Sequence, residues 1–487
     1  MNRRTITLVI TFTAAVLLLG SCAVNPVTGK KQLMLMTEAQ EIQLGADYDP
    51  QVVATFGEYR DDRMLALINE KGKEMGLISH RPKLAYHFRI LDTPVINAFA
   101  VPGGYIYLTR GILAHLNNEA EMLGVLGHEM GHITARHTAA SQAKQQLGSL
   151  LLIGGMIASE EFRNYAEYAM QGMQLLFLSF SRDDEREADR LGVEYSSKIG
   201  YDAKKMADFY KVLVKMNMAS DHAGVPTFMS THPDPGDRYN SVLNDAGVWQ
   251  EKLGLETYAV NANNYLQLID GMIYGEDPRQ GFVEGNIFYH PELKFRFSFP
   301  PAWQFENSPM QVTMAPEDGK AMMIFTLATA NSLEEAAQKT IQELQLTLTD
   351  SRKTTINGMP ALITLTSQVS QDQATGQQTV TRILSGYINY SGMYYVFHGV
   401  SYEADFPSYA QYFESVMGSF NTLTDPAKLN VQPMRVRVVT AKSATTLADL
   451  FRSYGVPQDR YEEYALLNNR ELNSRIEAGT MIKITGR

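Results

Sequence analysis

The spacing of apolar residues divides the chain into a helical first half and a strand-rich second half. In the first half, apolar residues recur at three- and four-residue steps, as on a helix with one buried face, in segments that begin near Thr37, Asp62, Asn117 and Ser181. Shorter apolar runs between the second and third of these segments predict strands, at 84–91, 98–101 and 105–108. The turn residues Pro102-Gly103-Gly104 predict a hairpin that either offers an edge strand to an extended peptide or only packs.

From about residue 285 the apolar residues alternate with polar ones, which is typical of strands with one buried face. The predicted strands are 295–303, 312–315, 322–328, 361–367, 380–388 and 393–400. Helical spacing returns at 333–348 and 408–420, so we predict an α+β domain at 285–425. A last unit at 434–487 has the order strand, helix, helix, strand, with elements at 436–440, 446–454, 460–468 and 480–485.

The first 21 residues differ from the rest of the chain. Arg3 and Arg4 precede an apolar run that ends in small residues before Cys22, which is the plan of a secretory signal. Cys22 is the only cysteine, and its position resembles a bacterial lipobox. That resemblance implies cleavage before Cys22 and lipidation of its thiol, so we predict a signal peptide at 1–21 and a tether at 22–34.

Composition narrows the possible partners and metal ligands. A chain of 487 residues exceeds the usual size of one domain and fits two to four. Its 53 acidic residues outnumber its 43 basic ones, so no basic stripe is expected and nucleic acid is not a predicted partner. Beyond residue 21 no apolar run reaches the roughly 18 residues of a membrane-spanning helix. Without further cysteines, a metal must be bound by His, Asp or Glu.

The third helical segment contains His128-Glu129-Met130-Gly131-His132, an H-E-x-x-H motif. Residues four apart on a helix share a face, so both imidazoles can reach one zinc ion. Glu129 would then address a metal-bound water rather than the metal, as a general base for peptide-bond hydrolysis. Because two unrelated histidines on an ordinary helix would give the same letters, a third ligand has to decide between these explanations.

Acidic residues in the fourth helical segment are the candidates for that ligand. Glu185 and Asp189 are four apart and therefore share a helix face. Glu185 could provide the third bond to zinc, while Asp189 could accept the free ring N–H of a ligating histidine and fix its tautomer. Glu187 is a rival ligand by composition, and a solvated acidic helix face would explain the same pattern.

Three segments, 97–104, 127–137 and 181–189, resemble the motifs of the M48 zinc metallopeptidases. This family includes Ste24-like and HtpX-like relatives. The resemblance is strongest to its periplasmic BepA-like lipoprotein branch. The resemblance covers roughly residues 25–275 and implies a mainly helical, zincin-type domain at 35–280. It also implies one zinc per chain, held by His128, His132 and Glu185, with Glu129 as the catalytic acid–base. Asp189 would accept a hydrogen bond from the ring N–H of a ligating histidine, on the side away from the metal.

A second element of the same family is implied farther along the chain. Thr231-His232-Pro233, followed by Arg238, resembles the family's downstream His-Pro element. The resemblance implies that His232 regulates the site or binds the transition state; a histidine in the open zinc position would inhibit until displaced. His137 also matches the family pattern, and we predict a structural role for it. The chain lacks the period of about 34 residues of tetratricopeptide repeats, so the branch's repeat-based interactions are not expected.

The two C-terminal units resemble other families. The 285–425 unit is similar to the PsbP/Mog1 type and has no constellation of titratable residues, which indicates a binding or spacer module. The 434–487 unit resembles a LysM domain in phrases such as Thr446-Leu447-Ala448-Asp449-Leu450, which implies peptidoglycan contact. Its start, Ala444-Thr445-Thr446-Leu447, departs from the family's usual Gly-Asp-Thr-Leu, so glycan binding stays open.

Together these patterns predict an α+β multidomain, zinc-dependent endopeptidase of the bacterial cell envelope. We expect a lipid-anchored enzyme on the periplasmic side, with the outer membrane as its location, that hydrolyses unfolded or misassembled envelope proteins. The expected partners are polypeptide substrates, the membrane through the lipid, and peptidoglycan. Two alternatives are a non-proteolytic chaperone or assembly factor with a latent zinc site, and a peptidoglycan-associated hydrolase.

Overall fold

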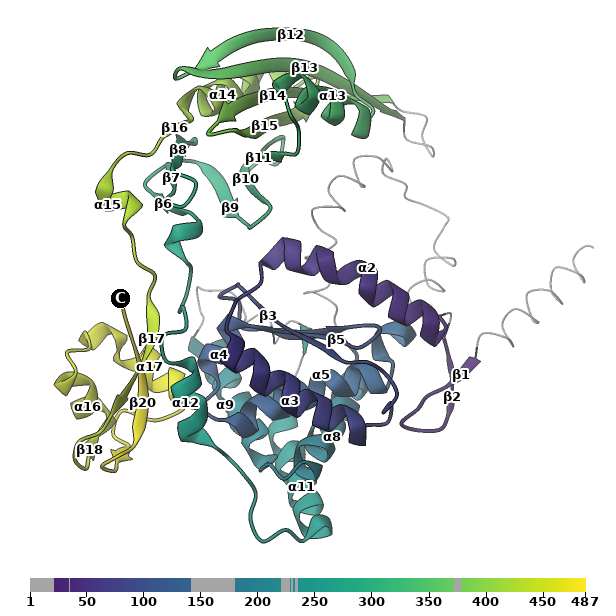
Figure 1. Ribbon diagram of the computed structural model, residues 1–487, viewed down its shortest axis with the longest axis vertical. Helices are drawn as coiled ribbons and strands as arrows, with labels where there is room; N and C mark the ends of the chain where they lie inside the picture. Colours follow the sequence, from purple (N-terminus) through teal and green to yellow (C-terminus); the bar gives the residue numbers. More distant parts are fainter. Residues whose placement is uncertain are drawn as a thin grey trace, which may run out of the picture.

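The computed structural model describes residues 22–34, 36–141, 180–219, 228, 231–232, 235–371 and 378–487 (Figure 1). The predicted signal peptide lies outside these residues. The described part has a helical N-terminal region, followed by sheet-rich regions, so the α+β multidomain class is observed. None of its helices combines the length and the apolar character that a membrane span requires.

The first region is built around a small sheet. Its elements are β1 (Cys22–Val24), β2 (Lys31–Leu33), α2 (Glu38–Phe56), α3 (Asp62–Ile78), β3 (His87–Leu91), β4 (Ala98–Val101), β5 (Tyr105–Thr109), α4 (Arg110–His115), α5 (Glu119–Thr134), α8 (Arg182–Lys198), α9 (Lys204–Ala219), α11 (Pro235–Leu253) and α12 (Ala262–Ile269). The strand order is β3-β5-β4, with β3 parallel and β4 antiparallel to β5, so the predicted hairpin is confirmed and β4 is an edge strand.

Alternate residues of this sheet face two different cores. Val52 and Phe56 of α2 pack with Phe99 and Tyr107 on one face. Ala98 and the other alternate residues join the main core with α3 and α5 on the opposite face (Figure 1). The sheet is therefore covered on both sides, and β4 lies directly against α5.

Helix α5 is the centre of the first region, and all 16 of its residues are buried. Its start is the predicted one: the Asn118 side chain accepts a hydrogen bond from the Glu121 backbone N–H at 2.8 Å. The Glu121 carboxylate in turn accepts from the Asn118 amide and from the Asn117 backbone N–H. These reciprocal bonds satisfy donors that a helix start leaves free.

Small residues bring α5 and α8 into close contact. A Cβ atom on Gly127 would lie 3.0 Å from the Cα of Gly192, and one on Gly131 would lie 3.0 Å from the Cα of Ala188. Larger side chains at these positions would push the two backbones apart. The close approach allows side chains of α8 to reach those of α5 in the interior of the protein.

The second region is a twisted antiparallel sheet with helices on both faces. Seven of the described strands form it in the order β12-β13-β14-β15-β11-β10-β9. Its elements, with a smaller sheet beside it, are η1 (Pro278–Gln280), β6 (Phe282–Glu284), β7 (Ile287–His290), β8 (Phe295–Ser298), β9 (Trp303–Asn307), β10 (Gln311–Pro316), β11 (Ala321–Ala328), α13 (Leu333–Glu343), β12 (Thr347–Ile356), β13 (Met359–Gln371), β14 (Gln378–Tyr390), β15 (Met393–Tyr402), α14 (Phe406–Ser419), β16 (Asn421–Thr422) and α15 (Pro426–Leu429). Helix α14 packs on the larger core and α13 on the smaller one.

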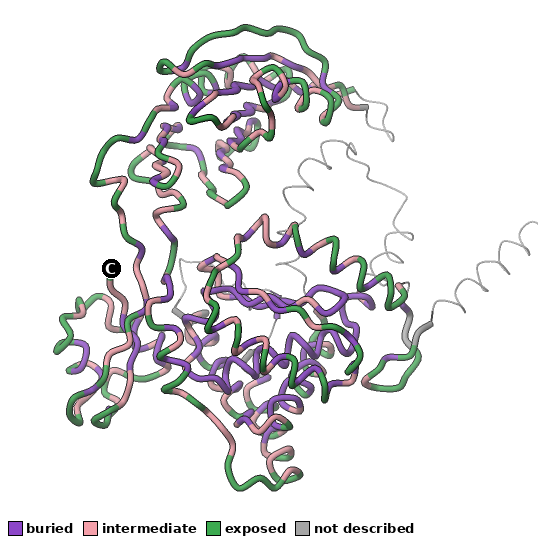
Figure 2. Tube along the Cα trace, viewed as in Figure 1, coloured by how far each residue is buried: buried purple, intermediate pink, exposed green. Residues whose placement is uncertain are grey.

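Two predicted elements in this region differ from the structure. The strand expected at 295–303 is divided into β8 and β9, with residues 299–302 outside both. A single helix was expected at 333–348, but α13 ends at Glu343 and β12 begins at Thr347. Gln345 has a φ of 51°, a left-handed conformation that ends the helix. All residues of β12 except Ile356 are exposed, as the long arc in Figure 2 shows. An edge strand with both faces in solvent has no apolar alternation from which it could be predicted.

The third region has the predicted order of strand, helix, helix and strand. Its elements are β17 (Arg435–Thr440), β18 (Thr445–Thr446), α16 (Leu447–Ser453), η2 (Gln458–Arg460), α17 (Tyr461–Leu467), β19 (Arg475–Ile476) and β20 (Met481–Gly486). Strands β17 and β20 pair antiparallel. The backbone N–H of Val436 donates to the carbonyl oxygen of Met272, and the N–H of Gly271 donates to the carbonyl of Val436. The third region is thus hydrogen-bonded to the end of the first.

Lys483 anchors this contact. Its side chain is fully buried, and its Nζ donates to the carbonyl oxygens of Ala114, His115 and Leu116 at 2.9, 3.2 and 2.8 Å. These carbonyls end α4, where the helix leaves its acceptors unpaired. The lysine therefore satisfies the end of a helix in a different region of the chain.

Replacing Lys483 with methionine should destabilise the whole protein, because it strands three buried carbonyl oxygens. We expect the free energy of unfolding in urea to fall by about 3 kcal/mol. The matched control is Lys442→Met at an exposed position, which should change it by less than about 0.5 kcal/mol. Equal stabilities for the two variants would contradict an anchoring role.

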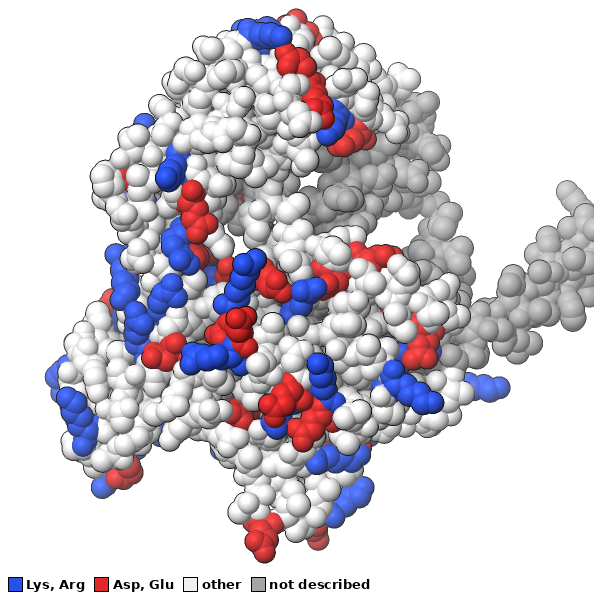
Figure 3. All heavy atoms as spheres, viewed as in Figure 1, with Lys and Arg blue, Asp and Glu red and all other residues white. Residues whose placement is uncertain are grey.

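The surface charge is mixed. On the face drawn in Figure 3, Lys and Arg side chains lie among Asp and Glu side chains rather than in a stripe of one sign.

Candidate metal centre

Two histidines of α5 point to one place. His128 and His132 occupy successive turns, are both buried, and bring their Nε2 atoms to 3.1 Å from each other. The spacing of four residues therefore gives the shared face that the sequence predicts. Glu129, the next residue after His128, is also fully buried.

Helix α8 contributes a carboxylate to the same place. Its start is the predicted cap, in which the Ser181 side chain accepts from the Asp184 backbone N–H. One turn in, Glu185 lies with its oxygens 3.6 Å from Nε2 of His128 and 3.5 Å from Nε2 of His132. Glu187 lies 3.2 Å from His137 instead, so the structure places Glu185, and not its rival, beside the two histidines.

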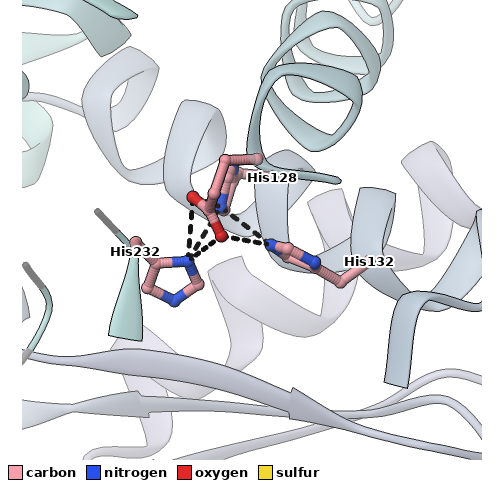
Figure 4. Close-up of side chains that lie close together, drawn as sticks. His128, His132 and His232 are labelled. Carbon is pink, nitrogen blue, oxygen red and sulfur yellow. Dashed lines mark hydrogen bonds and ion pairs between the residues drawn. The ribbon is translucent and has the colours of Figure 1, made fainter. Parts of the chain in front are cut away.

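The fourth member comes from the segment between α9 and α11. Nδ1 of His232 lies 3.0 Å from a Glu185 oxygen and 3.2 Å from Nε2 of His128 (Figure 4). Phe228 stacks on the His232 ring at 4.4 Å and accepts its backbone N–H, which holds the histidine in this position. His232 is only 1% exposed, so it is part of the interior rather than a surface loop residue.

The donor set fits a zinc ion. One ligand atom from each of His128, His132, Glu185 and His232 lies within 4.8 Å of the others. A tetrahedral zinc with bonds of about 2.0–2.1 Å has ligand atoms about 3.4 Å apart. The separations of 3.0 to 3.6 Å given above cluster around that value. Imidazole nitrogen and carboxylate oxygen are also the ligand types that zinc accepts.

Glu129 lies beside this cluster without joining it. One of its carboxylate oxygens lies 3.6 Å from Nε2 of His232. Within the described part of the chain, neither of its buried oxygens has a hydrogen-bond donor. Burial raises the pKa of Glu129 above its ordinary value. The charges of His232 and His128 would lower this pKa, but the effect of burial is larger. A buried carboxyl group with free oxygens and a raised pKa is suited to accept and release a proton.

Asp189 is hydrogen-bonded to the ring nitrogen of His128 that faces away from the cluster. Its Oδ1 lies 2.9 Å from Nδ1 of His128, which leaves Nε2 to face the cluster. Arg238 donates to both oxygens of Asp189 at 2.6 Å and also lies 2.6 Å from Glu185. Burial would raise the pKa of Asp189, but the charge and hydrogen bonds of Arg238 outweigh it and lower that pKa. The phenol of Tyr210 donates to Asp189 as well, at 2.6 Å.

The edge strand β4 packs against α5, the helix that contains His128 and His132. All four residues of β4 are buried. Asn97, just before it, is fully buried, and neither polar atom of its side chain has a partner within the described residues. Buried amides are normally paired, so the Asn97 side chain keeps unused hydrogen-bonding capacity among the described residues.

Sequence patterns gave little sign of three neighbours of the cluster. Tyr210 lies in an apolar stretch of helical spacing and Phe228 in a short mixed segment, and neither pattern indicates a metal site. His137, for which a structural role is predicted, has its Nδ1 3.0 Å from Nδ1 of His132. The chain returns to His132 because Arg136, with a φ of 60°, turns it sharply after α5, and no helical spacing signals that turn. Cys22 begins β1, but its side chain lies outside the described part.

Comparison with known proteins finds a matching family and several similar relatives. Residues 65–246 match peptidase family M48. The chain is 30% identical over 219 residues to the beta-barrel assembly-enhancing protease of Escherichia coli K12, covering 42% of this chain and 44% of that protein. It is 32% identical over 197 residues to the mitochondrial metalloendopeptidase OMA1 of Arabidopsis thaliana, covering 40% and 38%. The match thus spans less than half the length of either relative.

Solved structures give weaker likenesses. Cyanobacterial PsbP from Synechocystis has a TM-score of 0.24 at 12% identity, covering 29% of this chain and 94% of that one. Mog1p of Saccharomyces cerevisiae has a TM-score of 0.22 at 13% identity, covering 30% and 99%. At these TM-scores the likeness indicates neither the fold nor the function of this chain.

Proposed function

From the M48 peptidase domain at residues 65–246, we propose that this chain is a zinc-dependent endopeptidase. The observation that carries the proposal is the buried cluster of three histidines and a glutamate beside a carboxylate with free oxygens. His128, His132 and Glu185 hold one zinc ion, and Glu129 is the catalytic acid–base. Zinc supplies Lewis-acid chemistry there, lowering the pKa of a water molecule to about 7 and polarising a carbonyl.

The protein side chains provide the proton transfers and the alignment. Glu129 accepts the proton of the attacking water and later gives it to the amine that leaves, which requires a carboxyl whose pKa can serve both steps. An extended substrate adds to the edge of β4, where backbone groups can pair with it. The amide of Asn97 is free to hold the substrate backbone at the start of that strand.

His232 would fill the fourth position of a zinc tetrahedron in this conformation, because its Nδ1 lies 3.0 Å from Glu185 and 3.2 Å from His128. We propose that it holds the enzyme quiet until it moves, because catalysis needs that position for water. The His232 ring is held by stacking on Phe228, so opening requires the ring to leave that contact.

Replacing His232 with alanine should raise casein degradation while zinc stays bound to the other three ligands. If the histidine fills the position nine-tenths of the time, the rate should rise about tenfold. The matched control is His87→Ala at an exposed position on β3, which should leave the rate unchanged. A fall in rate with zinc retained would contradict gating and assign His232 to the transition state.

We also propose where the enzyme works and on what. The signal-like residues 1–21 and Cys22 support lipid anchoring at the periplasmic side of the envelope, with the outer membrane as the location. A relative that is a beta-barrel assembly-enhancing protease supports unfolded or misassembled envelope proteins as substrates. In this proposal the peptidase domain is 35–280.

The remaining regions are proposed as accessory domains. Residues 285–425 form a PsbP/Mog1-like binding or spacer domain. Residues 434–487 form a LysM-like domain that contacts peptidoglycan, a role supported by the phrases in its sequence and by its strand, helix, helix, strand order.

The test is casein degradation by the chain that starts after Cys22, before and after removal of zinc with a chelator and after zinc is restored. We expect activity that disappears and returns with the metal. Bound zinc without proteolysis, together with suppressed aggregation of an unfolded envelope protein, would favour a chaperone instead. Release of muropeptides from sacculi would favour a peptidoglycan hydrolase.

A further inference from the structure

A hydrogen-bonded chain runs outward from the metal cluster through His132. In Figure 4 one ring nitrogen of His132 faces the cluster and the other points away from it. That second nitrogen, Nδ1, lies 3.0 Å from Nδ1 of His137, and Nε2 of His137 lies 3.2 Å from an oxygen of Glu187. His132 and His137 are each 1% exposed, whereas the Glu187 side chain is 16% exposed. These hydrogen bonds therefore connect the buried metal cluster to the protein surface.

Metal binding by His132 would fix the position of each ring proton in this series of hydrogen bonds. A histidine that offers Nε2 to a metal carries its proton on Nδ1 and must donate it. His137 can accept that bond only through an unprotonated Nδ1, so its own proton lies on Nε2. The carboxylate of Glu187 accepts the proton from Nε2, and Asp184 stands farther off at 3.7 Å. Each member of the chain thus selects the tautomer of the next.

The positions of the carboxylates on α8 explain why Glu187 reaches His132 through the ring of His137. Asp189 lies one turn after Glu185 and reaches His128 directly at 2.9 Å. Glu187, two positions after Glu185, projects from a different side of the helix. The His137 ring spans the remaining gap, with its centroid 5.0 Å from that of His132 and the two planes at 73°. Phe180 stacks on His132 at 4.1 Å, so the ring is held by packing as well.

We propose that His137 and Glu187 are positioning residues for the zinc ligand His132, which set its tautomer and ring orientation and thereby strengthen metal binding. The proposal rests on the zinc site proposed above. Glu187 acts on His132 through His137, because one of its oxygens is hydrogen-bonded to the His137 ring while the other lies 3.8 Å from Arg190. The two metal-binding histidines are thus supported by two carboxylates of the same helix, one directly and one through a relay.

The test is zinc affinity, measured on the purified full chain by competition with a chromogenic chelator. His137→Phe keeps a ring and removes the acceptor, and should raise the zinc Kd by about 10- to 100-fold. Glu187→Gln should raise it by a smaller factor, and the double variant should bind no more weakly than His137→Phe alone. His137→Asn places an acceptor close to the former Nδ1 and should recover part of the affinity.

The matched control is Asp183→Asn, which changes an acidic residue of the same helix whose side chain is 96% exposed and should leave the zinc Kd unchanged. A zinc Kd within about threefold of the parent in both His137→Phe and Glu187→Gln would overturn the proposal, because it lies below the expected range. Additive losses in the double variant would overturn the relay. If His137→Phe fails to fold, Glu187→Gln at the surface still decides. Parent protein that binds zinc but degrades no casein would refute the proposed function without touching this result.

Discussion

Replacing Glu129 with glutamine should reduce casein degradation by about 10³-fold while the bound zinc stays in place. Glutamine keeps the shape of the side chain but cannot accept a proton from water or return it to the leaving amine. Zinc should be retained because Glu129 is not among the four clustered residues, and its 3.6 Å contact is with Nε2 of His232, whose other ring nitrogen faces the cluster. The loss should therefore appear in kcat, with metal content near one per chain.

The measurement needs a control for the loss of a carboxylate as such. Glu74→Gln makes the same change on α3, where the side chain is 47% exposed, and should leave the activity unchanged. Zinc content and the melting temperature should be compared in parent and variants. Undiminished proteolysis by Glu129→Gln would remove this residue from the mechanism, and a parallel loss of zinc would make it a metal-binding residue instead.

Replacing Arg238 with methionine should cost about 3–5 kcal/mol of unfolding free energy in the zinc-free protein. Methionine fills much of the same apolar space but leaves Asp189 and Glu185, both fully buried, without the cation that lies 2.6 Å from each. Uncompensated charges in an interior are expensive because neither water nor a counterion stabilises them. Zinc should restore part of the loss, since it brings positive charge to Glu185.

Urea unfolding with and without zinc measures both effects. Arg190→Met on α8 removes an arginine that is 63% exposed and should change the stability by less than about 0.5 kcal/mol. The double variant Arg238→Met, Asp189→Leu should regain stability relative to Arg238→Met alone, because one stranded carboxylate is then gone. Equal stability of Arg238→Met and the parent would show that the buried carboxylates do not depend on this ion pair.

Much of the fold follows from local patterns. Asn118, Ser181 and Thr37 cap helices where the sequence predicts them, since a capping side chain acts on backbone groups only two or three residues away. The hairpin around Pro102-Gly103-Gly104 is local in the same way. By contrast, the exposed strand β12 carries no apolar pattern, and its pairing with β13 is what makes it a strand.

The sequence by itself determined that His128 and His132 share a helix face and that Glu185 and Asp189 share another, because helical spacing fixes these relations within one turn. Only the tertiary structure decided the rest of the cluster. The glycine contact between α5 and α8 brings the two faces together, and it is set by packing rather than by spacing. His232, Arg238 and the His137 turn reach the cluster from separate segments, at positions that depend on how those segments pack around the buried charges.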